Sequence, residues 1–218
     1  MSGKASNEDV TFDFSRRERL GFPEIVYGES KSIDQLQRIV AQCREKNHPI
    51  LISRCQAAKA ENLEDGMYDD IAQTWRWEAS PPESRSGKVA ILSGGTADAP
   101  VVAECSNVLK FLGLQTKSFQ DVGVASVQRF LNHLPELKSY DVLVVVAGFE
   151  GALASVVAGQ CHQPVIGVPT SVGYGVAKDG QAALHAMLSS CANGLMVMNI
   201  DNGVGAALAA GRILKMAE

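Results

Sequence analysis

The stretch Asp141-Val142-Leu143-Val144-Val145-Val146 decides the fold of this protein. Its six positions carry four β-branched side chains, which favour an extended backbone. Because no polar residue interrupts the run after Asp141, both faces of the strand are expected to be buried. A strand buried on both faces is typical of a parallel sheet that helices cover on each side. The stretch therefore predicts a parallel α/β domain.

The same pattern recurs on both sides of this stretch. Apolar segments alternate with segments of helical periodicity from residue 88 to residue 214. The predicted strands are 88–92, 115–119, 141–146, 164–168 and 195–199, and the predicted helices are 99–112, 126–134, 150–160, 181–189 and 203–214. With right-handed crossovers, this order predicts a doubly wound, flavodoxin-like or Rossmann-like three-layer sandwich. Its ligand crevice lies beyond the carboxyl ends of the strands.

The first 80 residues predict a smaller α+β region. A helix is expected after Ser32, because Ser32 can cap it and Gln35 follows three residues later, as in a capping box. A short strand is expected at 50–53, and 68–78 is a candidate second strand. The polar, Pro-rich segment 81–87 predicts a linker. We thus expect an N-terminal region at 1–80 and a catalytic domain at 88–218.

The bulk composition excludes several classes of protein. The net charge of −4, without a basic block, argues against a nucleic-acid partner. No segment has the about 20 apolar residues of a membrane span. The N-terminal MSGKASNEDV is polar and acidic, unlike a signal peptide. The five cysteines include no C-x-x-C pair, so we expect reduced thiols in a cytoplasmic protein.

The loops after the five strands concentrate glycine, hydroxyl and carboxylate groups. Gly94 and Gly95 let the backbone approach a ligand, and the helix that follows offers free N–H groups to an anion. Asp98 and Glu150 each have two readings, as caps of the following helices or as functional carboxylates. Together these loops predict a small-molecule enzyme. The residues predicted to bind substrate are Ser93, Gly94, Gly95, Thr96, Asp98, Gly148, Gly151, Pro169, Thr170, Ser171, Tyr174, Gly175, Asn199, Asp201 and Asn202.

The last predicted helix has almost no side-chain bulk between residues 205 and 211. Such a helix packs closely against another backbone. We therefore expect contact with a neighbouring subunit there, with close packing on the chain's own sheet as an equal alternative.

Several segments resemble a known family. They are 93–101 (SGGTADAPV), 121–124 (DVGV), 147–153 (AGFEGAL), 168–175 (VPTSVGYG), 190–192 (SCA) and 199–203 (NIDNG), with RLGFPEIVYG at 19–28 upstream. They resemble the PurE-type family of aminoimidazole ribonucleotide carboxylases and mutases. They more closely resemble its LarB relatives, which make pyridinium-3,5-biscarboxylic acid mononucleotide for a nickel-pincer cofactor. The resemblance covers most of the chain and implies a PurE-like fold.

One loop separates the two relatives. PurE-type proteins carry a catalytic His in the loop after the third strand, followed by Leu-Pro-Gly, whereas residues 152–155 here read Ala-Leu-Ala-Ser. LarB-type proteins have Glu-Gly-Ala-Leu, which this chain keeps at 150–153. They usually continue with Pro, where this chain has Ala154. The resemblance therefore favours the LarB type.

A LarB-type protein implies a specific chemistry. Its substrates are nicotinic acid adenine dinucleotide and carbon dioxide or bicarbonate, it releases AMP, and it uses no organic cofactor. Its transient cysteine nucleophile lies in a motif that matches Ser190-Cys191-Ala192, which singles out Cys191. Glu150 or Asp121 is then the expected proton acceptor. A Mg²⁺ ion would offset phosphate charge, with Asp98, Asp121 and Asp201 as candidate ligands.

The position of Cys191 raises a geometric question. It precedes the last predicted strand, so it lies at the opposite edge of the sheet from the other loops, about 15 to 20 Å away. We therefore predict that Cys191 reaches the site of a neighbouring subunit. The resemblance implies a homo-oligomer, an octamer with shared sites. Two alternatives stay open, a PurE-type carboxylase or mutase that lacks the His, and a non-catalytic nucleotide-binding protein.

Overall fold

The C-terminal part of the chain, in a computed structural model, contains five strands and their connecting helices. The strands are β5 (Lys88–Ser93), β6 (Gln115–Phe119), β7 (Val142–Ala147), β8 (Val165–Pro169) and β9 (Met196–Val197). They form one parallel sheet in the order β6-β5-β7-β8-β9. The stretch that predicted the fold is thus the central strand, β7, and all six of its residues are buried. The predicted doubly wound, flavodoxin-like sandwich is confirmed.

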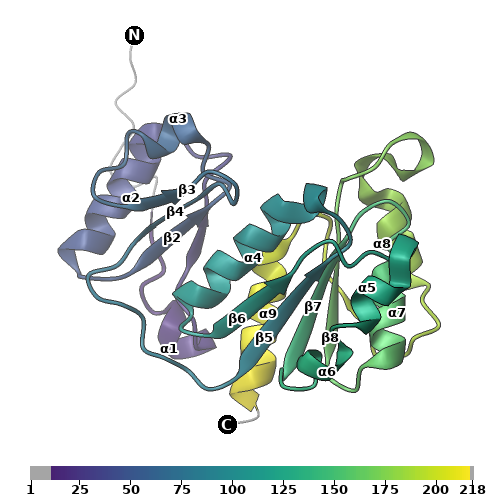
Figure 1. The fold of residues 1–218 in the computed structure, drawn as a ribbon. Coiled ribbons are helices and arrows are strands. Elements are labelled where there is room, and N and C mark those ends of the chain that lie inside the picture. The colour runs from purple at the N-terminus through teal and green to yellow at the C-terminus, as the bar shows by residue number, and fades with distance from the viewer. Residues whose placement is uncertain (1–10, 217–218) are drawn as a thin grey trace. The chain divides into compact units, whose positions relative to one another are not determined.

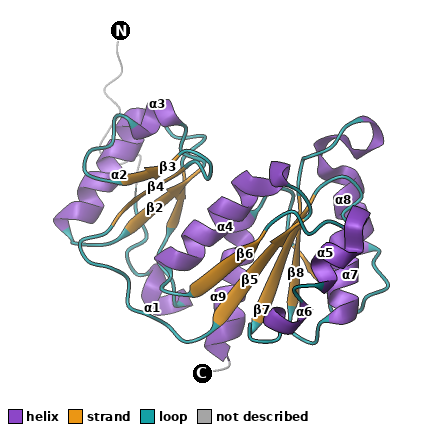
Figure 2. Ribbon diagram, in the orientation of Figure 1, coloured by secondary structure: helices purple, strands orange, loops and turns teal. Residues whose placement is uncertain are grey.

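Helices cover both faces of this sheet (Figures 1 and 2). They are α4 (Ala99–Phe111), α5 (Val127–Leu131), α6 (Leu134–Leu137), α7 (Ala152–Gln160), α8 (Gln181–Leu188) and α9 (Gly203–Met216), with 3-10 turns η1 (Thr96–Asp98), η2 (Val124–Ser126) and η3 (Gly175–Gly180). Helices α4 and α9 lie on one face, and α5 to α8 pack on the other around the buried Phe130, Leu153 and Met187. The apolar strands are buried because both faces are covered.

The small residues of α9 pack within the chain. Ala206, Ala207 and Ala210 are fully buried, and α9 runs against α4. A β-carbon at Gly203 would lie 2.7 Å from the carbonyl oxygen of Val101, so the two helices approach at backbone distance. This contact explains the low side-chain bulk of α9 without a second subunit.

Several predicted elements differ in extent from the observed ones, and three examples show how. The helix expected at 126–134 divides into α5 and α6, because Pro135 has no backbone N–H to donate to the carbonyl of Leu131 and so cannot continue α5. The strand expected at 195–199 shrinks to the two residues of β9, at the sheet edge. Helix α7 begins at Ala152 rather than at Glu150, since Gly151 before it adopts a left-handed conformation with φ 64°.

The N-terminal unit is an α+β fold with its own sheet. It contains α1 (Arg16–Leu20), β1 (Ile25–Tyr27), α2 (Ile33–Glu45), β2 (Ile50–Ser53), α3 (Ala57–Ala60), β3 (Met67–Asp69) and β4 (Thr74–Trp77). The strand order is β1-β2-β4-β3, and the core gathers around Leu36, Ile52 and Trp75. The predicted capping box is present, because Ser32 and Gln35 exchange hydrogen bonds. The single strand expected at 68–78 is instead a hairpin of β3 and β4.

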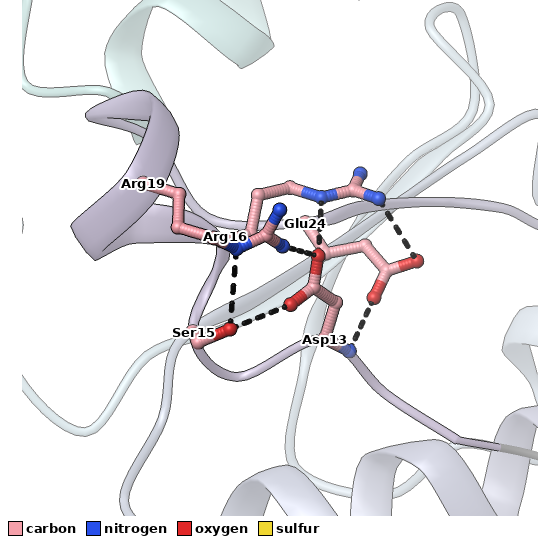
Figure 3. A network of polar contacts seen from close by, with 5 residues as sticks. All are labelled: Asp13, Ser15, Arg16, Arg19 and Glu24. Atoms are coloured by element: carbon pink, nitrogen blue, oxygen red, sulfur yellow. Dashed lines mark hydrogen bonds and ion pairs between the residues drawn. The ribbon is translucent and has the colours of Figure 1, made fainter.

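A network of charged side chains ties α1 to the segment before it (Figure 3). Asp13 accepts hydrogen bonds from Arg19 and, at 3.1 Å, from Arg16, while its own backbone N–H donates to Glu24 at 2.8 Å. The hydrogen bond from Arg19 is the main reason that the pKa of Asp13 is lowered. These contacts stabilise the start of the N-terminal unit.

The structure describes residues 11–216, which divide into two compact units after Pro81. Across this described range, each helix is too short or too polar to span a bilayer. The prediction about the N-terminal MSGKASNEDV falls on residues outside this range.

Candidate active site

A cavity of about 430 Å³ lies at the carboxyl edge of the parallel sheet. Its walls come from the loops after β5, β6 and β7, together with one residue after β8, so it occupies the crevice that the doubly wound fold predicts. The lining residues are Gly94, Gly95, Thr96, Ala97, Asp98, Asp121, Gly123, Val124, Ala125, Arg129, Ala147, Gly148, Phe149, Glu150, Ala152, Leu153 and Val172. Seven predicted site residues thus meet in one cavity.

Asp98 organises the floor of this cavity. Its Oδ2 accepts a hydrogen bond from the backbone N–H of Gly95 at 3.0 Å, and its Oδ1 accepts one from the hydroxyl of Thr170 at 2.7 Å. The side chain is buried, and burial raises the pKa of Asp98, while the bonds from Thr170 and Gly95 oppose the rise. Asp98 therefore joins the loop after β5 to the loop after β8.

Replacing Thr170 with Val should destabilise the protein by about 1.5–3 kcal/mol at neutral pH, because the ionised carboxylate loses a buried donor. Since the pKa of Asp98 is already raised in the folded chain, its ionisation lowers stability as the pH rises above the ordinary value of 3.8. The variant raises that pKa further, so the difference from wild type should shrink as the pH falls toward 3.8. Urea unfolding of the variant and of wild type across this pH range measures the difference in their free energies of unfolding.

The matched control for this variant is Thr170→Ser, which keeps the hydroxyl and should restore most of the stability at neutral pH. A Thr170→Val variant that is destabilised equally at neutral and acidic pH would show that lost packing, not the bond to Asp98, accounts for the change.

Two glycines allow the loops that line the cavity to approach one another at backbone distance. A β-carbon at Gly148 would lie 2.3 Å from the carbonyl oxygen of Val172, and one at Gly123 would lie 2.4 Å from that of Gly94. Distances below 3.0 Å force the backbone to move. Any larger residue at either position would push apart the loops that line the cavity.

An ion pair and the ring of Phe149 line the cavity. Asp121, which follows β6, accepts a hydrogen bond from Nη1 of Arg129 on α5. Glu150 is exposed in the loop before α7. Beside it, the ring of Phe149 meets the exposed ring of Tyr174 edge to face, with 5.5 Å between centroids. The cavity thus combines carboxylates with a guanidinium and an aromatic surface.

The other predicted substrate-binding residues, Tyr174 among them, do not line the cavity. Ser93, Pro169 and Thr170 are buried beneath the loops. The carboxylate of Asp201 accepts a hydrogen bond from the backbone of Ser171 at 2.8 Å. Asn199 and Asn202 accept bonds from backbone N–H groups of Ile200 and Gly205, Gly151 packs against Ala183, and Gly175 lies in open space with φ 61°.

The carboxylates predicted as magnesium ligands already have partners within this chain. In residues 11–216 no group of three or more Asp, Glu, His or Cys side chains is arranged to hold a metal ion. Both oxygens of Asp98 already accept hydrogen bonds, and Asp121 is paired with Arg129. The predicted Mg²⁺ stays a prediction, and no step below depends on it.

Cys191 lies away from the cavity lining, in the loop between α8 and β9 at the amino edge of the sheet. The hydroxyl of Ser190 accepts a hydrogen bond from the backbone of Ala192 at 3.1 Å and shares another with Ser155 at 2.7 Å. These bonds shape the turn that presents Cys191, which is exposed.

The other four cysteines are poor nucleophiles. Burial raises the pKa of Cys43 to about 12 and that of Cys55 to about 11, and it also raises the pKa values of Cys105 and Cys161. A thiol with a raised pKa forms little of the reactive thiolate at neutral pH. Exposure therefore separates Cys191 from the rest.

Sequence reasoning missed several cavity residues, and Arg129 is the most consequential. It lies eight residues after Asp121 on a short helix, where no motif marks it. The missed apolar and small residues are Ala97, Gly123, Val124, Ala125, Ala147, Phe149, Ala152, Leu153 and Val172. All of these except Ala125 stood within the quoted motifs, but nothing in their spacing indicated which residues face the cavity.

Comparison with known proteins identifies both units. The AIR carboxylase family model matches residues 88–218, and the model of the LarB/PurE-like N-terminal domain matches residues 6–78. An uncharacterized protein of Methanocaldococcus jannaschii is 36% identical over an alignment of 230 positions, which covers 96% of this chain and 85% of that protein. The likeness thus extends over both units.

Solved structures share the fold of the C-terminal unit. The crystal structure of Treponema denticola PurE matches with a TM-score of 0.52 and 20% identity, over 60% of this chain and 82% of its own. The crystal structure of a variant of Treponema denticola PurE2 matches with a TM-score of 0.51 and 21% identity, over 60% of this chain and 81% of its own. Because the AIR carboxylase model spans more than half of the chain, the protein belongs to the AIR carboxylase family in its LarB/PurE-like form, which supports a carboxylase-type role.

Proposed function

We propose that this protein carboxylates the pyridinium ring of nicotinic acid adenine dinucleotide through a transient bond to Cys191, and that it then releases AMP. Two observations carry the proposal: Cys191 is exposed, and the described lining of the cavity holds three carboxylates and no histidine. A PurE-type reaction relies on a histidine in the loop after β7, where this chain has Ala152 and Leu153. The carboxylates suit a cationic ring.

The chemistry follows from the electron demand of the ring. A pyridinium carbon does not attack carbon dioxide, because the ring is electron-poor. Addition of the Cys191 thiolate at C4 forms a carbon–sulfur bond and converts the cation into a neutral enamine. The enamine is nucleophilic at C5, which forms a carbon–carbon bond to carbon dioxide. Covalent catalysis thereby reverses the reactivity of the ring.

The remaining steps restore the ring. A base removes the proton at C5, and the carbon–sulfur bond then breaks, so the thiolate leaves and aromaticity returns. The net reaction consumes one carbon dioxide and releases one proton. Glu150 and Asp121 both line the cavity and are the candidates for the base. Addition of one water to the phosphoanhydride would then yield AMP and the carboxylated mononucleotide.

Mass spectrometry of the protein mixed with nicotinic acid adenine dinucleotide, in buffer freed of carbon dioxide, tests the proposal. We expect a mass increase equal to one dinucleotide, confined to the peptide that contains Cys191, because the adduct then has no electrophile to attack. Added labelled bicarbonate should discharge the adduct and place label in the nucleotide product.

A parallel incubation with aminoimidazole ribonucleotide tests the PurE-type alternative, which the AIR carboxylase match supports. A protein that consumes aminoimidazole ribonucleotide and forms no adduct with the dinucleotide would contradict our proposal and support that reaction. A protein that binds nucleotides and transforms neither substrate would be a binding protein.

A further inference from the structure

The cavity has an uneven charge distribution. Three carboxylates line it, those of Asp98, Asp121 and Glu150, whereas Arg129 is the single lysine, arginine or histidine among its described lining residues. A ligand that carries only negative charge would meet two carboxylates in excess of the guanidinium. A zwitterionic ligand group would find a partner for each of its charges. The lining therefore favours a group with adjacent positive and negative charges.

Arg129 is held in place for such a role. Its helix, α5, is anchored by the neighbouring Phe130, which is fully buried in the core between the sheet and α7. Its Nη1 donates to Asp121, and its buried Nε has no acceptor within the described residues. A guanidinium offers five N–H donors, so much of its capacity is left for a ligand.

The ion pair with Asp121 contributes little to folding. Both side chains are substantially exposed, at 40% for Arg129 and 53% for Asp121, and exposed pairs contribute little to stability. What the pair does is orient the guanidinium in the cavity wall. An oriented guanidinium binds a carboxylate through two parallel hydrogen bonds, which a neutral amide cannot match.

We propose that Arg129 binds the ring carboxylate of the pyridinium substrate and so selects the nicotinic acid dinucleotide over its nicotinamide counterpart. This inference rests on the proposed function above. The positive ring nitrogen would then lie among the cavity carboxylates, and Asp121 would serve as a positioning residue through Arg129.

Isothermal titration of the full chain tests the inference with the acid and amide dinucleotides as probes, in a Cys191→Ser background so that neither ligand forms an adduct. This parent should bind the acid form about 10- to 100-fold more tightly, the range expected for one charge-assisted bidentate contact. Arg129→Gln should lose that factor for the acid form and change the affinity for the amide form by less than about threefold. Lys110→Gln, an exposed change outside the cavity lining, should leave both affinities unchanged.

The outcomes separate the candidate contacts. Equal losses for both dinucleotides in Arg129→Gln would overturn the inference, because they would assign the guanidinium to the phosphates that the two ligands share. Unchanged affinities would overturn it as well. If the parent binds neither dinucleotide, the proposed function itself fails. Arg129→Lys, which keeps the charge but loses the fork of donors, should recover part of the preference.

Discussion

Replacing Cys191 with Ser is expected to reduce carboxylation about 1,000-fold or more while leaving the affinity for nicotinic acid adenine dinucleotide nearly unchanged. A hydroxyl stays protonated at neutral pH and adds poorly to a pyridinium ring, so the enamine does not form. The side chain is exposed and outside the cavity lining, so neither folding nor binding should suffer. Incorporation of labelled bicarbonate measures turnover, and titration with the dinucleotide measures affinity.

Cys161→Ser is the matched control, because Cys161 is a half-buried thiol whose pKa is raised by burial. This variant should retain wild-type turnover. The covalent mechanism is wrong if Cys191→Ser turns over at the wild-type rate, or if both variants lose activity equally.

Mixing two inactive variants should restore activity if the active site is shared between subunits. Cys191 lies at the amino edge of the sheet and the cavity at the carboxyl edge, and the six residues of β7 between these edges span about 20 Å. No side chain of one chain bridges such a distance. We therefore propose that the thiol serves the cavity of a neighbouring subunit in a homo-oligomer.

The experiment co-expresses Cys191→Ser with the double variant Glu150→Gln and Asp121→Asn, which removes both candidates for the base. With random assembly, about one site in four would combine an intact cavity with an intact thiol, so about a quarter of wild-type turnover should return. Each variant alone should be inactive. Failure of the mixture to exceed either parent, in oligomers shown to contain both chains, would contradict the shared site.

The predicted elements and the observed ones agree where local pattern is strong. The buried runs that became β5, β7 and β8 follow from hydrophobicity and β-branching, and the capping box at Ser32 follows from spacing along one turn of helix. The strand expected at 68–78 became a hairpin because the Asp69 carboxylate accepts a bond from the Ala72 backbone and makes a turn. That bond depends on local backbone geometry, which composition does not specify.

The site was predictable only as a set of loops. Alternating strands and helices place the loops after β5, β6 and β7 at one edge of a parallel sheet, so their glycines and carboxylates had to lie near one another. Which side chains enter the cavity was not predictable from that topology. From the sequence, Asp98 could be a helix cap or a functional carboxylate. In the structure it precedes α4, and its carboxylate accepts hydrogen bonds from Gly95 and Thr170.

The sequence by itself determined a doubly wound parallel sheet, its functional edge and the family resemblance that singles out Cys191. Those features depend on periodicity and on contiguous motifs. Only the tertiary structure decided that Thr170, 72 residues away, holds Asp98, and that Arg129 pairs with Asp121 in the cavity wall. Such contacts join segments brought together by packing of the sheet and its helices, and their energies depend on burial and direction. The pattern of residues along the sequence specifies neither the burial nor the direction of such a contact.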